Sequence, residues 1–288
     1  MRCHNLFLCL FIFFHTSECK SVENSPVYGY HLRVGVPEAR RIAVKETLRG
    51  ARIVGGSQVT AATVIPYQVG IIAALTGGAS SVCGGSLIST TRVLTAAHCW
   101  FDGQTRATQF TIVLGSVTIF SGGTRLTTSD VTMHPNWNYY LNDIAYVKIS
   151  AVTLSNTIQL IALPTTAEAS RSFEGLDGLI SGFGKTSDAQ TTFPTSTALH
   201  QTTVSVITNA VCQNSFKVTI DSSHVCTSGT GGKGTCDGDS GGPLTVLLNN
   251  KRILIGVVSF GPSEGCQASS PSVFTRVTSF LTWINSNL

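Results

Sequence analysis

From residue 64 onward, the chain consists of short apolar stretches separated by clusters of Gly, Pro, Ser, Thr and Asn. Stretches such as YQVGIIAAL, FTIVLGS, TTVSVIT and ILIGVVSF are rich in Val, Ile and Thr. β-Branched residues favour strands, and runs repeated every ~8–12 residues are typical of a β-sandwich or β-barrel. No regular alternation with helical patterns and no internal repeat is visible in the sequence. The pattern therefore predicts an all-β fold.

The last segment, RVTSFLTWINSNL, departs from the strand pattern. Its apolar residues Val277, Phe280, Leu281 and Ile284 are spaced i, i+3, i+4 and i+7, which places them on one face of a helix. A closing α-helix is therefore expected. We expect its apolar face to pack on its own domain, and binding of a partner is the alternative.

Residues 1–19 form a separate N-terminal unit. One arginine is followed by an apolar run from Leu6 to Phe14 and then by small or polar residues, as in a secretory signal peptide. The run is too short to cross a bilayer, which needs about 20 apolar residues. We therefore expect a secreted, extracellular protein without a membrane anchor. Residues 20–52, which include VPEARRIAVKETLRGAR, are expected to be a solvated, protease-accessible leader.

The basic charge of the chain lies in the same N-terminal part. Residues 1–52 hold eight Lys or Arg and four Asp or Glu, whereas residues 53–288 hold eleven of each. Charged residues make up only 12% of the chain and hydrophobic residues 42%, against about 25% charged residues in a typical globular protein. This balance argues against a disordered protein, a nucleic-acid partner and a membrane-binding patch.

Six cysteines follow the leader, and an even number in a secreted chain indicates disulfides. They are Cys83, Cys99, Cys212, Cys226, Cys236 and Cys266. None forms a CxxC or CxxH pair, so no zinc site is expected. The spacing alone leaves several pairings open.

Three strings carry residues suited to hydrolytic chemistry. TCDGDSGGPL holds Ser240 in a glycine-rich turn, where backbone N–H groups can approach a substrate closely. A serine hydroxyl is a weak nucleophile and needs an adjacent base. LTAAHCW places His98 after an apolar strand, and NDIAYVKI places Asp143 directly before one. Alone, these residues would be a tight-turn serine, a structural histidine and a strand-end cap, but together they indicate nucleophilic catalysis.

With these residues, the chain resembles the chymotrypsin/trypsin-type serine endopeptidases. The matching strings are IVGG, PYQVGI, CGGSLI, LTAAHC, NDIAYVKI, SGFG, GDSGGPL and GVVSFG, in the family's order over residues 53–288. The resemblance implies two six-stranded antiparallel β-barrels, with the active-site cleft between them, and a C-terminal α-helix. The two halves are expected at about 53–165 and 166–288, and LPTTAEASRSFEG at 163–175 is expected to link them.

The resemblance also implies the roles of the catalytic residues, since this family is the standard example of the triad. Ser240 would be the nucleophile, and His98 the base that takes its proton and later gives it to the leaving amine. Asp143 would orient His98 and would itself be supported by Ser259. The N–H groups of Gly238 and Ser240 would form the oxyanion hole. The implied disulfides are Cys83–Cys99, Cys212–Cys226 and Cys236–Cys266.

The string RIVGG at residues 52–56 gains a meaning from the same resemblance. Cleavage after Arg52 would free the ammonium group of Ile53, which in this family pairs with the carboxylate beside the nucleophile, here Asp239. Residues 20–52 would then be an activation propeptide, and the uncut chain an inactive precursor with an incomplete oxyanion hole. Arg52 implies a trypsin-like activating protease.

The resemblance places six residues around the substrate pocket: Gly234, Asp237, Ser259, Phe260, Gly261 and Ser272. Gly234 stands where the trypsin branch has the aspartate that selects Arg and Lys. The small Gly261 leaves the pocket open, Ser272 narrows it, and the backbone of 259–261 would pair with the extended substrate. We therefore expect a chymotrypsin-like preference for large apolar or aromatic residues. Broad collagenolytic cleavage, as in the brachyurins, is the alternative.

Three departures from the family pattern bear on this expectation. Asp237 adds an acid at the pocket mouth, which either attracts a basic substrate side chain or is an exposed charge without a role in specificity. Phe183 and Phe260 replace the usual tryptophans and keep aromatic surfaces. The segment 117–124 lacks the paired acids of the family's calcium loop, so no metal and no cofactor are expected.

The expected partners are polypeptide substrates, the activating protease and protein inhibitors of proteases, and the enzyme is expected to be a monomer. A non-catalytic homologue that only binds partners is the alternative from another functional class, but such homologues usually replace Ser, His or Asp. Regulatory cascade proteases often carry a cysteine-rich leader domain, whereas residues 20–52 contain no cysteine. This favours a simple secreted enzyme with a role such as digestion.

Overall fold

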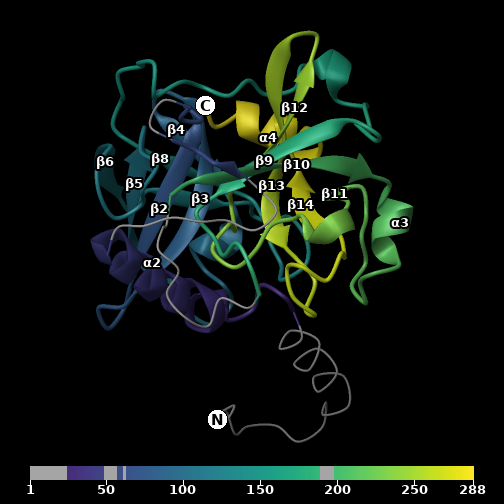
Figure 1. Ribbon diagram of the computed structural model, residues 1–288. Helices are drawn as coiled ribbons and strands as arrows, with labels where there is room; N and C mark the ends of the chain where they lie inside the picture. Colours follow the sequence, from purple (N-terminus) through teal and green to yellow (C-terminus); the bar gives the residue numbers. More distant parts are fainter. Residues whose placement is uncertain (1–24, 49–56, 61–62, 189–197) are drawn as a thin grey trace, which may run out of the picture.

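The computed structural model describes residues 25–48, 57–60, 63–188 and 198–288. The expected signal peptide at 1–19 and the expected cleavage site between Arg52 and Ile53 lie outside these residues. Most of the described secondary structure is β-strand, arranged in two sheets (Figure 1). The predicted all-β fold is confirmed.

The first half of the chain forms a seven-stranded antiparallel sheet in the order β6-β5-β2-β3-β4-β8-β7. The strands are β2 (Gln68–Leu75), β3 (Ser80–Ser89), β4 (Arg92–Thr95), β5 (Ala107–Leu114), β6 (Thr124–Thr128), β7 (Val131–Met133) and β8 (Ala145–Lys148). β2 and β3 are buried along nearly their whole length. In β2 and β3, one face fills the core of this half, and neighbouring parts of the chain cover the other face.

The second half forms a sheet in the order β1-β10-β11-β14-β13-β12-β9, and β9 also pairs with β10, so that six strands close into a barrel. The strands are β1 (Ser57–Gln58), β9 (Asp177–Gly182), β10 (His200–Ile207), β11 (His224–Thr227), β12 (Pro243–Leu248), β13 (Lys251–Phe260) and β14 (Ser272–Arg276). The short β1 precedes the first half in sequence but pairs with β10. It therefore ties the start of the domain to the second barrel.

Short helical elements connect the strands and close the chain. They are η2 (Ala97–Cys99), η3 (Thr166–Glu168), α3 (Asn209–Gln213), η4 (Thr230–Gly232), η5 (Val277–Phe280) and α4 (Leu281–Asn285). The four apolar residues of the predicted C-terminal helix are all buried and belong to the same core cluster as the first half. The rings of Phe280 and Trp283 both lie 5.1 Å from the ring of His134. The predicted helix and its packing on its own domain are therefore confirmed.

The leader differs from its expected state. Residues 31–48 form the π-helical turn η1 (His31–Gly35) and the helix α2 (Val36–Leu48), and both contact β3 (Figure 1). Val36, Ala39 and Ile42 are buried. The expectation of a solvated leader was wrong, because these apolar residues recur every three positions and form one helix face that packs on the first half.

Among the described residues, no helix has both the length and the apolar character that crossing a bilayer requires.

Candidate active site

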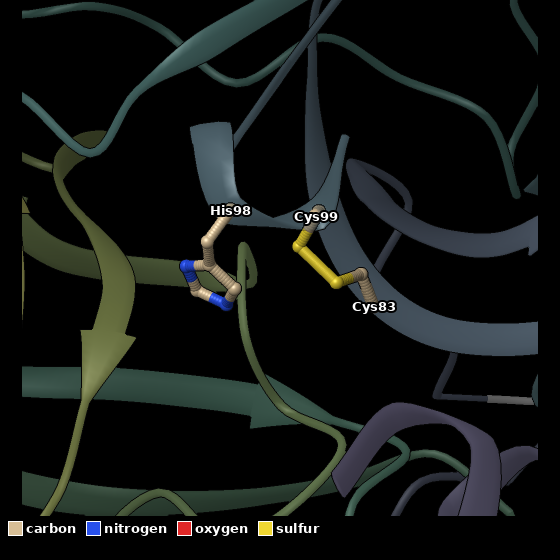
Figure 2. A group of neighbouring side chains, drawn as sticks. All are labelled: Cys83, His98 and Cys99. Atoms are coloured by element: carbon tan, nitrogen blue, oxygen red, sulfur yellow. A yellow bond between two sulfur atoms is a disulfide. The ribbon is translucent and has the colours of Figure 1, made fainter. Parts of the chain in front are cut away.

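His98 lies in the short helix η2, directly after β4, and its side chain is fully buried. The next residue, Cys99, forms a disulfide with Cys83 on β3 (Figure 2). The backbone N–H of His98 donates to Oδ1 of Asp143 at 2.9 Å, and its ring atom Nδ1 lies 2.7 Å from Oδ2 of the same residue. Both the main chain and the ring of His98 are therefore held by one carboxylate.

Asp143 precedes β8 and is positioned by its neighbour Asn142, which has a φ of 58° in the left-handed region. Asparagine tolerates this conformation better than most residues do. The hydroxyl of Ser259 also donates to Oδ2 of Asp143, at 2.6 Å. Burial alone would raise the pKa of Asp143, but the charge and hydrogen bonds of His98 and the hydrogen bond from Ser259 together lower it. The carboxylate is thus held in its ionised form.

Ser240 lies in the loop that leads into β12, and its loop packs closely on β3 and β4. The carbonyl oxygen of Ser240 accepts a hydrogen bond from the N–H of Gly84 at 2.7 Å. Gly241 has a φ of 81°, and a Cβ atom there would lie 2.3 Å from Oγ1 of Thr95. The GDSGG string therefore needs glycine at this position for the serine loop to approach the histidine loop.

The other ring nitrogen of His98, Nε2, is buried and has no hydrogen-bond partner among the described residues. No hydrogen bond therefore joins it to Ser240 in this structure. The ring instead packs against Tyr30 of the leader, with the ring centroids 4.6 Å apart. No motif in the leader predicts this contact.

Asp239, beside the serine, accepts hydrogen bonds from the N–H groups of Gly184 at 2.8 Å and Cys236 at 2.9 Å. A Cβ atom at Gly182 would lie 2.0 Å from Oδ1 of Asp239, so the first glycine of SGFG makes room for this carboxylate. Burial raises the pKa of Asp239 to about 6, although the two N–H groups oppose this shift. No described residue forms a salt bridge with Asp239.

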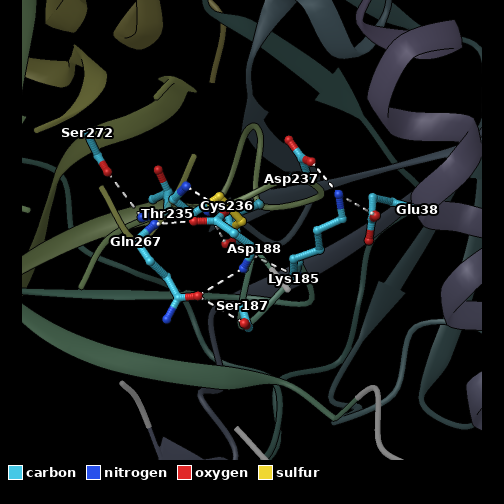
Figure 3. The surroundings of a disulfide bond; sticks show 12 residues. Glu38, Lys185, Ser187, Asp188, Thr235, Cys236, Asp237, Gln267 and Ser272 are labelled. Carbon is cyan, nitrogen blue, oxygen red and sulfur yellow. Dashed lines mark hydrogen bonds and ion pairs between the residues drawn. A yellow bond between two sulfur atoms is a disulfide. The ribbon is translucent and has the colours of Figure 1, made fainter. Parts of the chain in front are cut away.

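The six residues expected around the substrate pocket are not gathered in one cavity. Gly234 lines one cavity together with Asp239. Four of the other expected pocket residues line a second cavity together with Ser240. Those four are Asp237, Ser259, Phe260 and Gly261. Ser272 lines neither of these two cavities, and its Oγ accepts from the N–H of Thr235 at 3.1 Å (Figure 3).

Asp237 is paired, which the sequence analysis did not foresee. Nζ of Lys185 lies 2.6 Å from Oδ2 of Asp237 and 3.5 Å from Oε1 of Glu38 in the leader (Figure 3). Burial alone would lower the pKa of Lys185, but the hydrogen bond and charge of Asp237, together with Glu38, raise it. Because Lys185 already partners Asp237, this acid is not a free charge at the pocket mouth.

The six cysteines form three disulfides. They are Cys83–Cys99, Cys212–Cys226 and Cys236–Cys266, the pairs that the resemblance implies. The last one joins the serine loop to the segment after β13, next to Thr235 and Gln267 (Figure 3).

Comparison with known proteins extends these observations over most of the chain. The family model described as Trypsin matches residues 53–284. A collagenase from Hypoderma lineatum is 36% identical over 244 residues, which cover 83% of this chain and 88% of the relative. Brachyurin from Leptuca pugilator is 40% identical over 210 residues, which cover 70% of this chain and 85% of the relative. A solved structure of HL collagenase has a TM-score of 0.73 at 36% identity and covers 82% of this chain and 98% of its own.

Proposed function

Because the chain belongs to the trypsin family and is a serine endopeptidase with polypeptide substrates, we propose that it is a secreted zymogen activated by cleavage after Arg52. In this proposal, the mature enzyme starts at Ile53 and hydrolyses peptide bonds through an acyl-enzyme. The observation that carries it is the buried contact between His98 and Asp143, with Ser259 on the same carboxylate. In this proposal, the carboxylate holds His98 as the base that serves Ser240.

The chemical steps follow from these positions. As Oγ of Ser240 attacks the substrate carbonyl carbon, its proton passes to Nε2 of His98, and Asp143 stabilises the resulting imidazolium. The C–N bond then breaks, and His98 gives the proton to the leaving amine. A water molecule repeats the sequence on the acyl-enzyme, which releases the carboxylate product and restores Ser240. Asp143 stays ionised throughout, in agreement with its lowered pKa.

The reaction also requires that the negative charge on the substrate carbonyl oxygen, the oxyanion, be stabilised. We assign its stabilisation to the N–H groups of Gly238 and Ser240, each of which would contribute about 3 kcal/mol to lowering the barrier. Gly238 has a φ of 96°, a conformation that favours glycine. The orientation of its peptide group depends on the loop that also holds Asp239.

Activation would act on that loop. Burial raises the pKa of Asp239, whose carboxylate accepts hydrogen bonds from two N–H groups. It forms no salt bridge among the described residues. An ammonium group at Ile53 would supply the missing counter-ion. A carboxylate that gains such a partner in a buried place changes its position and its pKa together.

The specificity that we propose is for large apolar or aromatic residues. Gly234 and Gly261 bring no charge to the site, and nothing within 4 Å would meet a Cβ atom at Gly261. Pairing with Lys185 argues against Asp237 as a receptor for basic side chains. The names collagenase and brachyurin among the relatives favour broad collagenolytic cleavage as the second candidate.

The test is to cut the secreted precursor before Ile53 and to assay peptides with Phe, Leu, Ala or Arg before the scissile bond, together with native collagen. We expect activity that needs the cut, that favours Phe and Leu, and that is lost in Ser240→Ala. A clear preference for Arg would overturn the proposed specificity, and efficient cleavage of native collagen would favour the second candidate. Inertness on every substrate would overturn the proposed catalytic role. We also expect the mature enzyme to be a monomer that protein protease inhibitors bind.

A further inference from the structure

The described part of the leader, residues 25–48, lies across both halves of the protease domain. We call this part the leader segment. Near its start, Val27 is buried in a cluster with Phe260 of the second half. Farther along, Tyr30 and Ile42 are buried in the core cluster of the first half. The leader segment therefore contacts both sides of the cleft in which the active site lies.

Tyr30 is the part of the leader segment that touches the catalytic residues. Its ring centroid lies 4.6 Å from that of His98 at an interplanar angle of 64°, and its hydroxyl donates to the carbonyl oxygen of Val82 at 2.8 Å. Only 4% of Tyr30 is exposed. Burial raises the pKa of this phenol, and a hydrogen bond with the Ser240 side chain opposes the shift. A substrate that reaches Ser240 and His98 has to displace this ring.

The leader segment also narrows the space beside the serine. Pro26, Arg33 and Val34 line the same cavity as Ser240 and Gly261. Glu38 stands over the other proposed oxyanion donor, since a Cβ atom at Gly238 would lie 3.7 Å from Cβ and Cγ of Glu38. The leader segment thus covers the nucleophile, the base and the oxyanion loop together.

Polar contacts fix the leader segment at several points along its length. The N–H of His31 donates to Oδ2 of Asp102 at 2.7 Å, and Nδ1 of His31 lies 2.9 Å from Oγ of Ser81. Oε1 of Glu38 lies 3.5 Å from Nζ of Lys185. At the far end, Oε1 of Glu46 accepts from the N–H of Ile119 at 2.6 Å. These partners are all in the protease domain, so cutting the chain after Arg52 breaks none of the contacts.

From these contacts we propose that the leader segment is an inhibitor of the protease domain, and that it stays bound in the cleft after the activating cut. The inference rests on the proposed function, and it adds a second cause of latency that differs from the missing ammonium group. No disulfide retains the leader, because residues 20–52 contain no cysteine. The inhibition is therefore reversible, and activity requires that the cut leader dissociate or be degraded.

The experiment uses the full chain with residues 49–52 replaced by the recognition sequence of a protease that spares Arg40 and Arg41. After the cut before Ile53, we expect the leader to co-elute with the protease domain in gel filtration at micromolar concentration. Activity per molecule should rise on dilution to nanomolar concentration. Purified leader added back should raise KM and leave kcat unchanged, because it competes with substrate. Full activity at every concentration, with immediate separation of the leader, would overturn the proposal.

Leader variants test whether the inhibition depends on Tyr30. We expect the Tyr30→Ala leader to inhibit at least about tenfold more weakly, because buried aromatic side chains dominate such interfaces. Tyr30→Phe keeps the ring and loses only the hydrogen bonds of the hydroxyl to Val82 and Ser240, so its effect should be smaller. Leu32→Ala is the matched control, because Leu32 belongs to the same segment and is 54% exposed. Adding each leader to the same wild-type protease domain removes the risk that a variant precursor fails to fold. Equal inhibition by all four leaders would overturn the role of Tyr30.

A cut chain that carries Ser240→Ala separates this inference from the proposed function. Co-elution of leader and domain in that chain measures binding without any catalysis. If the leader binds but the wild-type domain is inert after its removal, the proposed function fails while the cleft-binding role stands. If the domain is active but the leader never binds, only the inhibitory role fails.

Discussion

The hydroxyl of Ser259 donates to Oδ2 of Asp143 at 2.6 Å, and the same oxygen lies 2.7 Å from Nδ1 of His98. The other carboxylate oxygen accepts the backbone N–H of His98 at 2.9 Å. The Asp143 side chain is therefore held by three donors from two different parts of the chain. Ser259 belongs to the second half and Asp143 to the first, so this hydrogen bond joins the two halves at the site.

Removal of this hydroxyl should slow the reaction. In Ser259→Ala, Oδ2 of Asp143 loses a donor, the pKa of Asp143 rises, and the imidazolium of His98 is held less firmly. A hydrogen bond to a charged group is worth about 1.5–3 kcal/mol, and water replaces part of it. We expect kcat to fall about tenfold with little change in KM, measured on the cut enzyme with one peptide substrate.

Ser279→Ala is the matched control for this prediction. It also removes a serine hydroxyl that donates a hydrogen bond, but that bond goes to the backbone carbonyl of Ser222 on the surface. Its kcat should equal that of the parent enzyme. An unchanged kcat in Ser259→Ala would contradict the assigned support of Asp143.

The pKa of Asp239 gives a prediction about the stability of the uncut chain. This pKa is raised to about 6, so the fold favours the protonated carboxyl. The stability that Asp239 contributes is present below its ordinary pKa of about 4 and is lost as the pH rises through about 6. The loss should reach at most about 3 kcal/mol. After the cut, pairing with the Ile53 ammonium should lower the pKa of Asp239 and abolish this loss.

Urea unfolding at pH 4.5 and pH 7 measures this effect in cut and uncut Ser240→Ala chains. Asp239→Asn serves as the reference at each pH. The contributions of other titrating groups to the free energy of unfolding, such as that of His31, whose pKa burial lowers to about 4, then cancel in the comparison. The same pH dependence in the cut and the uncut chain would argue against the ion pair.

Sequence and structure agree best where a short string determines the geometry. GDSGG and SGFG are among the strings that match the family, and in the structure a Cβ atom at Gly241 or Gly182 would collide with a neighbouring part of the chain. The period of the last segment predicted the buried face of the C-terminal helix. In each case, the signal lies within a short string, although the atoms that a Cβ at Gly241 or Gly182 would meet belong to Thr95 and Asp239, which are distant in the sequence.

The contacts that the sequence did not reveal join residues that are distant in the chain. Lys185 and Asp237 are 52 positions apart, and each alone has the pattern of an ordinary surface charge. Tyr30 lies in a leader in which charged residues are interspersed with apolar ones, so no continuous apolar run marks the buried positions of α2. The three-residue spacing of Val36, Ala39 and Ile42 is the one signal in the sequence for this packed face.

The ammonium group of Ile53 should make the cut enzyme sensitive to alkali. Pairing with Asp239 raises the pKa of this amine above its ordinary value of about 7.7–8.0. The stabilisation is fully present below the ordinary pKa and is lost as the pH rises through the raised one. We expect kcat/KM to fall with a single ionisation above pH 8, while urea unfolding shows that the domain remains folded. Constant kcat/KM up to the pH of unfolding would contradict the activation mechanism.

A charge at Gly234 tests the proposed pocket. Gly234 lines the cavity that also holds Asp239, and a Cβ atom there would lie 2.9 Å from Oγ of Ser272. In Gly234→Asp, binding of a Phe side chain would bury a carboxylate without a partner, which costs several kcal/mol. We expect the ratio of kcat/KM for Arg over Phe substrates to rise at least about tenfold, mainly through loss of activity on Phe. Gly234→Asn has nearly the same volume without the charge and should lower both activities alike. If Asp and Asn have the same effect on the ratio, Gly234 does not line the primary specificity pocket of the active enzyme.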